Sequence, residues 1–134
     1  CKGGMKMRMR ILVVDDNIDI LDVLVGLLSK DGVEIEAVDS YDAAQMLLLS
    51  REYECDLFDY RIGKYNGLHL LRLLRARNPK TRVFMVTGDA DDPALRAEAL
   101  RLGAEDVLHK PVFSAGLIAK VFGRLRDWEE RKTL

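Results

Sequence analysis

The stretch "RILVVD", residues 10–15, decides the fold. It is rich in β-branched residues and apolar on both faces, which is typical of a central parallel strand that is covered on both sides. Beyond it, short apolar runs alternate with longer stretches of helical period. This alternation indicates βα units around a parallel sheet, so we predict an α/β fold with five such units.

The remaining elements are read from the same alternation of short and long apolar patterns. Ser40 or Asp39 is expected to cap the second helix, and Asp91 or Asp92 the fourth. We expect the other strands at 33–38, 54–59, 82–87 and 105–109. We expect helices from Ile18 to a stop at 30–32, over 41–51, from Gly67 to Asn78, from Pro93 to Gly103 and from Ser114 to about residue 130.

Length and composition are those of one globular domain: 134 residues, 49% hydrophobic and 32% charged. A net charge of -1 gives no basic field for a phosphate backbone, so we expect no direct nucleic-acid binding. No apolar run is long enough to cross a bilayer and no signal-peptide core is seen, so we expect no membrane contact and a cytoplasmic location. We assign residues 1–8 to a flexible tail or to residues foreign to the natural protein, 9–126 to the domain, and 127–134 to a helix end or the start of a linker.

Acidic, hydroxyl and ammonium side chains stand where predicted strands end: Asp15 and Asp16, Asp59, Thr87 and Lys110. In an open parallel sheet these ends meet at the edge where ligands bind. Clustered carboxylates repel one another unless a cation lies among them, and hard oxygen ligands suit Mg²⁺ with a phosphoryl group. One carboxylate could then act as nucleophile, with the lysine and threonine on the phosphoryl oxygens. Each residue taken alone has a structural reading; Asp15 and Asp16, for example, could simply cap the first helix.

Four motifs carry a resemblance to a known family. Through them the chain resembles the receiver domain of two-component response regulators over residues 9–126. The resemblance implies a flavodoxin-like (βα)5 domain with strand order 2-1-3-4-5 and helices on both faces. The motifs are "VVDDN" at 13–17, "DYRIGKYNG" at 59–67, "VFMVTG" at 83–88 and "GAEDVLHKPV" at 103–112.

The same resemblance implies roles for individual residues. Asp59 would be the phosphoacceptor and a metal ligand, and the donor a phosphohistidine on a sensor histidine kinase or phosphotransfer protein. Such a domain is not an enzyme for an external substrate; it assists its own phosphoryl transfer and hydrolysis. The Mg²⁺ ligands would be Asp15, Asp16, Asp59 and the backbone carbonyl of Arg61, and the phosphoryl oxygens would be bound by Thr87 and Lys110.

Two departures keep an alternative open. Val107 stands where the family usually has a switch aromatic, and Gly63 where it usually has proline, which should leave the acceptor loop looser. The alternative is a receiver-like interaction module that does not depend on phosphorylation. A flavodoxin-like enzyme or nucleotide binder ranks last, since no Gly-rich loop follows the first strand. The output domain or partner, and a phosphorylation-dependent homodimer, are left open.

Two further charged positions lead to specific hypotheses. Asp56 lies inside a strand covered on both sides, where a charge is costly, so we predict a basic or hydrogen-bonding partner, for example Arg10 or Arg82 from the flanking strands. Arg61 and Asp89 lie two residues beyond Asp59 and Thr87, at positions that flank the phosphoryl site in the family that the chain resembles. Because their charges are opposite, we expect an ion pair that shields the acyl phosphate from water.

Overall fold

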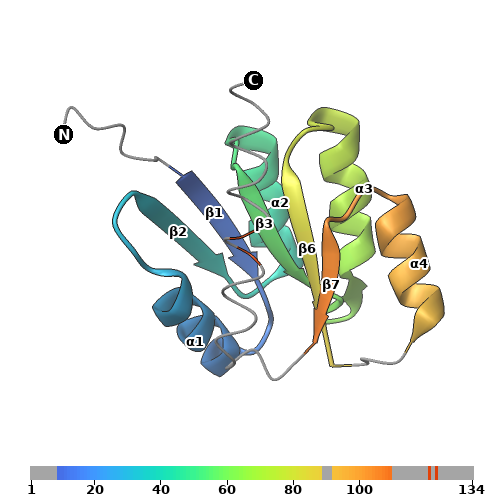
Figure 1. Ribbon diagram of the computed structural model, residues 1–134, viewed down its shortest axis with the longest axis horizontal. Helices are drawn as coiled ribbons and strands as arrows, with labels where there is room; N and C mark the ends of the chain where they lie inside the picture. The colour runs from blue at the N-terminus through green and yellow to red at the C-terminus, as the bar shows by residue number, and fades with distance from the viewer. Residues whose placement is uncertain (1–8, 89–91, 110–120, 122, 124–134) are drawn as a thin grey trace.

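The computed structural model describes residues 9–88, 92–109, 121 and 123. Within them, five parallel strands form one sheet in the order β2-β1-β3-β6-β7, with helices on both of its faces (Figure 1). Because β6 and β7 are the fourth and fifth strands of this sheet, the expected order 2-1-3-4-5 is confirmed. The strands of the sheet are β1 (Met9–Val14), β2 (Val33–Val38), β3 (Cys55–Asp59), β6 (Arg82–Thr87) and β7 (Asp106–His109).

Each of the four described helices begins at a polar side chain that accepts a backbone N–H of the first turn. The caps are Asn17, Ser40, Asn66 and Asp92. The helices are α1 (Ile18–Leu28), α2 (Tyr41–Ser50), α3 (Gly67–Arg77) and α4 (Pro93–Arg101). The first helix ends before the predicted glycine; Gly32, with φ 85°, instead forms the turn into β2.

The two faces of the sheet bury different residues because side chains alternate along each strand. Ile11 and Val13 pack with the leucines of α1 and with Val121, whose inward position in the last helix is thereby confirmed. Leu12 and Val14 belong to the cluster that α2, α3 and α4 cover. The sheet is therefore buried on both sides, as the apolar first strand predicts.

The segment after β3 contains a hairpin that the sequence did not predict. β4 (Arg61–Ile62) and β5 (Tyr65–Asn66) pair antiparallel, with Gly63 at φ 62° in the turn. Ile62 is 1% exposed and belongs to the core cluster, so the hairpin is anchored to the domain. Strands of two residues are too short to show a hydrophobic period, so the sequence pattern could not reveal this hairpin.

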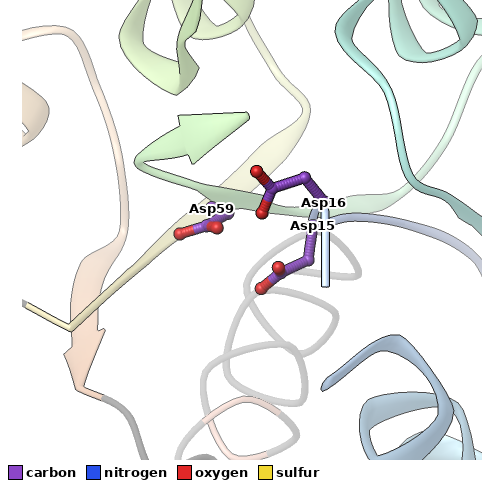
Figure 2. A group of neighbouring side chains, drawn as sticks. All are labelled: Asp15, Asp16 and Asp59. Carbon is purple, nitrogen blue, oxygen red and sulfur yellow. The ribbon is translucent and has the colours of Figure 1, made fainter. Parts of the chain in front are cut away.

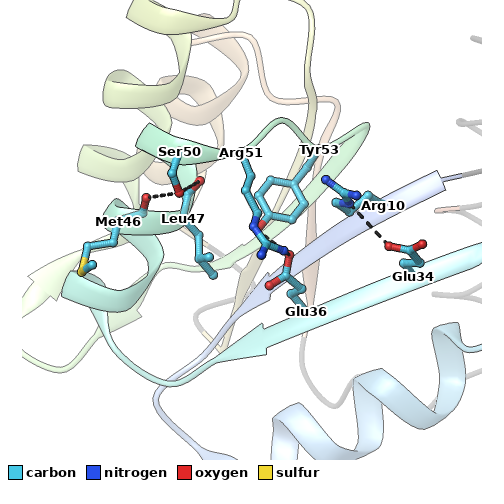
Figure 3. Close-up of polar contacts among 8 residues, drawn as sticks. All are labelled: Arg10, Glu34, Glu36, Met46, Leu47, Ser50, Arg51 and Tyr53. Carbon is cyan, nitrogen blue, oxygen red and sulfur yellow. Dashed lines mark hydrogen bonds and ion pairs between the residues drawn. The ribbon is translucent and has the colours of Figure 1, made fainter.

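The edge strand β2 is tied to the segment between α2 and β3. Glu36 accepts hydrogen bonds from Arg51 Nη1 at 2.8 Å and from the hydroxyl of Tyr53 at 2.9 Å (Figure 3). Burial, and then the bond to Glu36, raise the pKa of Tyr53 above its ordinary value. At neutral pH the phenol is protonated, as an ordinary tyrosine is, and donates to the carboxylate.

Some predictions concern residues that the structure does not describe. The tail at 1–8, the end at 127–134 and most of the last helix lie outside the described residues, so their boundaries stay predictions. In the part that is described, no helix combines the length and the apolar character that a membrane crossing requires.

Candidate functional site

Three carboxylates meet at the carboxyl edge of the sheet. One oxygen each of Asp15, Asp16 and Asp59 can be chosen so that all lie within 4.8 Å of one another (Figure 2). The cause is the register of two neighbouring strands, because Val14 of β1 lies beside Phe58 of β3. Asp15 directly follows Val14, and Asp59 directly follows Phe58, so the two carboxylates lie side by side. The predicted convergence is confirmed for the three acids.

The three acids are held in different ways. Asp15 is 1% exposed and its Oδ1 accepts the N–H of Asn17 at 2.9 Å. Asp59 is 6% exposed, whereas Asp16 is exposed and its Oδ2 accepts the N–H of Gly63 at 2.9 Å. Since Asn17 caps α1, the reading of the acidic pair as a helix cap is wrong.

The donor set fits a magnesium ion. Three carboxylates this close repel one another unless a cation neutralises them. Mg²⁺ prefers a few carboxylate oxygens together with water and phosphoryl oxygens, and the set contains no sulfur or imidazole ligand that would favour a softer metal.

Thr87 reaches the same edge. It is the last residue of β6 and 3% exposed, and its predecessor Val86 lies beside Asp59 in the register of β3 and β6. Arg61, the expected carbonyl ligand, begins β4 two residues after the acceptor. Lys110 follows the end of β7 and lies outside the described residues, so its place at the site stays a prediction.

The backbone at the acceptor is clamped from two sides. The N–H of Tyr60 donates to the carbonyl of Val86 at 2.9 Å, and the N–H of Gly67 donates to the carbonyl of Tyr60 at 2.7 Å. A Cβ at Gly67 would lie 2.0 Å from the carbonyl oxygen of Asp59. Sequence reasoning missed this role, although glycine at the first position of a helix, where it is a poor helix former, was the available signal.

Asp56 contradicts one prediction. Its carboxyl group is completely buried, and neither oxygen has a hydrogen-bond partner within the described part of the chain. Its neighbours across the sheet are Leu12 and Val83, which can offer no hydrogen bond from a side chain. Burial raises the pKa of Asp56 well above its ordinary value, while the positive charge of Arg75 opposes the rise.

The predicted partners of Asp56 are engaged elsewhere. Arg10 forms an ion pair with Glu34 at 3.5 Å (Figure 3), and Arg82 with Glu105. Arg82 lies beside Cys55 in the register and so shares its face of the sheet, opposite to that of Asp56. The prediction of an Asp56 ion pair with Arg10 or Arg82 is therefore wrong.

Val107 lies where the switch aromatic was expected. It is 4% exposed and belongs to the same buried cluster as Leu95 and Ala99 on the inner side of α4. A short β-branched side chain that is packed in this way has few rotamers open to it. The effect of Val107 on switching stays a prediction.

Comparisons with known proteins agree with this geometry. A family model described as "Response regulator receiver domain" matches residues 11–122. The transcriptional regulatory protein FixJ of Azorhizobium caulinodans is 35% identical over 109 residues, 81% of this chain and 51% of that protein. The DNA-binding response regulator MtrA of Mycobacterium leprae is 35% identical over 124 residues, 90% of this chain and 52% of that protein.

Solved structures resemble the chain over nearly its whole length. The response regulator receiver domain protein (CheY-like) from Methanospirillum hungatei JF-1 has a TM-score of 0.84 and 27% identity, covering 92% of this chain and 98% of that one. The chain spans about half the length of the curated relatives described above. It belongs to the family of response regulator receiver domains, the receiving modules of two-component signalling.

Proposed function

We propose that Asp59 accepts a phosphoryl group from a phosphohistidine and that the acyl phosphate switches the conformation of the domain. The observation that carries this proposal is the convergence of Asp15, Asp16 and Asp59 at one edge of the sheet. Asp59 is the one of the three that ends a strand of the sheet, and it lies between the other two acids and Thr87 in the order of the strands. The donor would be a sensor histidine kinase or a histidine phosphotransfer protein.

The proposed reaction is a displacement at phosphorus. An oxygen of the Asp59 carboxylate forms the new bond to phosphorus as the P–N bond to the donor imidazole breaks, and the nitrogen keeps the electron pair. Hydrolysis later restores the carboxylate when water attacks phosphorus and inorganic phosphate leaves. Thr87 and Lys110 would donate hydrogen bonds to the phosphoryl oxygens during both steps.

The residues present also fit a bound Mg²⁺. Asp15, Asp16, Asp59 and the carbonyl of Arg61 would hold it. The ion would neutralise charge that gathers on the phosphoryl oxygens in the transition state. Asp15, which is buried and hydrogen-bonded to the N–H of Asn17, would be the most rigid of these ligands.

Incubation with acetyl phosphate and Mg²⁺, followed by intact mass measurement, tests the proposal. The wild-type chain should gain the mass of one phosphoryl group, and Asp59→Asn should gain none. Asp56→Asn is the matched control, because it makes the same chemical change three residues away on the same strand and should leave phosphorylation intact. Phosphorylation of Asp59→Asn at the wild-type rate, or no phosphorylation of the wild-type chain, would overturn the proposal.

The phosphorylation-independent interaction module is not favoured. Neither Gly63 nor Val107 removes an acid from the cluster, and the family to which the chain belongs matches over the whole site. Mg²⁺-dependent binding of a beryllofluoride mimic to the wild-type chain would further separate the two functions.

The partners and the output belong to the same proposal. A chain that spans about half of its relatives is consistent with a receiver that is joined to an output domain, and we propose that such a domain or a separate protein reads the switch. We infer that the receiver itself does not bind nucleic acid directly and does not act as an enzyme on an external substrate. We also infer a cytoplasmic location, and that inference rests on the family alone.

A further inference from the structure

A backbone hydrogen bond joins the acceptor hairpin to one of the acids. The N–H of Gly63, in the turn between β4 and β5, donates to Oδ2 of Asp16 at 2.9 Å, although 47 residues separate the two in sequence. Hydrogen bonds from a neutral N–H to a carboxylate are about twice as strong as neutral ones. The bond connects the loop after β1 to the turn that follows β3.

This contact depends on the glycine. Gly63 has φ 62°, a conformation from which proline is excluded because its ring fixes φ near -65°. Proline, which the family usually has here, also has no N–H to donate. The chain therefore has a donor beside Asp16 that the usual residue cannot supply.

Asp16 needs such a donor more than the other two acids do. Asp15 and Asp59 are buried, so packing restricts their side chains. Asp16 is exposed, so without a hydrogen bond its side chain would lose rotational freedom on metal binding, which costs conformational entropy. The donor itself is held firmly. Ile62, next to Gly63, is buried in the core, and the hairpin pairs along both of its short strands.

We propose that the Gly63 N–H is a positioning group that orients Asp16 as a Mg²⁺ ligand. The inference rests on the proposed magnesium site. A carboxylate has two oxygens, so accepting one hydrogen bond on Oδ2 leaves the other oxygen available to a metal. Removal of the outer hydrogen-bond partner of a metal ligand typically weakens metal affinity by about 10- to 100-fold.

Calorimetric titration of the intact chain with Mg²⁺ tests the proposal. Gly63→Pro should weaken Mg²⁺ binding by about 10- to 100-fold. Gly63→Asn should bind Mg²⁺ like the wild type, because asparagine keeps the N–H, tolerates positive φ, and would have no atom of the described residues within 4 Å of its Cβ. Gly32→Pro is the matched control: it imposes the same backbone conflict, at φ 85°, before β2 at the other edge of the sheet, and should leave the affinity unchanged.

A second measurement does not depend on whether the Gly63→Pro variant folds. In the metal-free chain, hydrogen exchange of the Gly63 amide, followed by NMR, should be faster in Asp16→Ala than in the wild type. Equal exchange rates in the two, or a Gly63→Pro chain that binds Mg²⁺ as tightly as wild type, would overturn the inference and leave the proposed function standing. A wild-type chain that binds no Mg²⁺ would overturn the proposed metal site, and the inference with it.

Discussion

Asp56 and Asp59 lie three residues apart on β3 and point to opposite faces of the sheet. Asp56 is flanked by Leu12 and Val83 in the interior, whereas Asp59 reaches the carboxyl edge beside Asp15. The same type of side chain thus meets a buried apolar layer at one position and a cluster of acids at the other. Their chemistry differs because of position on the strand and not because of local sequence.

Removal of the Asp56 carboxyl should change how stability depends on pH. Burial raises the pKa of Asp56, with Arg75 opposing and Glu54 adding to the rise, so the folded chain keeps a proton that the unfolded chain releases. The stability that this group contributes is complete below about pH 4 and is lost as the pH rises toward the folded-state pKa. Relative to Asp56→Asn, the wild type should lose up to about 1.4 kcal/mol per pH unit in that range.

Urea unfolding at pH 5 and pH 8 measures this difference. Asp22→Asn, which alters an exposed aspartate of α1, is the control and should follow the wild type at both pH values. Parallel pH dependences of the wild type and Asp56→Asn would show that the carboxyl group is ionised in the folded chain.

Gly67→Ala should displace the phosphoacceptor. The new Cβ would lie 2.0 Å from the carbonyl oxygen of Asp59, so the end of β3 or the start of α3 must move. We expect a loss of about 1–3 kcal/mol in stability and slower phosphorylation by acetyl phosphate at saturating Mg²⁺. Gly26→Ala, within α1, should instead keep the wild-type rate, because no atom of the described residues lies within 4 Å of the position of its Cβ. A Gly67→Ala chain with both properties unchanged would contradict the clamp.

Arg75 should contribute strongly to stability. Its guanidinium donates to the carbonyls of Thr81 at 2.7 Å, Gly103 at 2.8 Å and Leu102 at 3.2 Å, and so joins α3 to the segments that precede β6 and β7. Arg75→Met leaves these carbonyls without that donor and should lower the free energy of unfolding by about 2–4 kcal/mol.

Arg72→Met on the same helix is the control for this substitution. Arg72 forms an ion pair with Glu98 at 3.0 Å, and both side chains are partly exposed, so its loss should cost much less stability than the loss of Arg75. Equal losses for the two variants, measured by chemical unfolding, would argue against the bridging role of Arg75.

Arg61→Ala should shorten the life of the acyl phosphate. Arg61 is exposed on β4, and we predict that it pairs with Asp89, which lies outside the described residues, to shield the phosphoryl group from water. An exposed ion pair supplies up to about 1 kcal/mol, which corresponds to about two- to fivefold faster hydrolysis when it is lost. The decay of phosphorylated protein after removal of the donor measures the rate. Lys64→Ala, in the same hairpin, should decay like the wild type, and an unchanged half-life for Arg61→Ala would count against the shield.

Much of the fold could be predicted because its signals are local. The bounds of β2 and β6 agree with the predicted ranges, and Ser40 and Asp92 cap their helices through contacts within one turn. The end of α1 was predicted too late, since Gly32 serves the following turn and not the helix. The β4–β5 hairpin was missed because two-residue strands carry no periodicity.

The sequence by itself determined the parallel α/β fold and its βα order, because these follow from hydrophobic period and chain order. It also placed Asp15, Asp16, Asp59 and Thr87 at or just after the carboxyl ends of strands. Only the tertiary structure decided that the buried Asp56 carboxyl group has no hydrogen-bond partner among the described residues and that the Gly63 N–H meets Asp16. Both depend on the register between segments far apart in the chain. A local pattern does not specify that register; it is set when the two faces of the sheet pack.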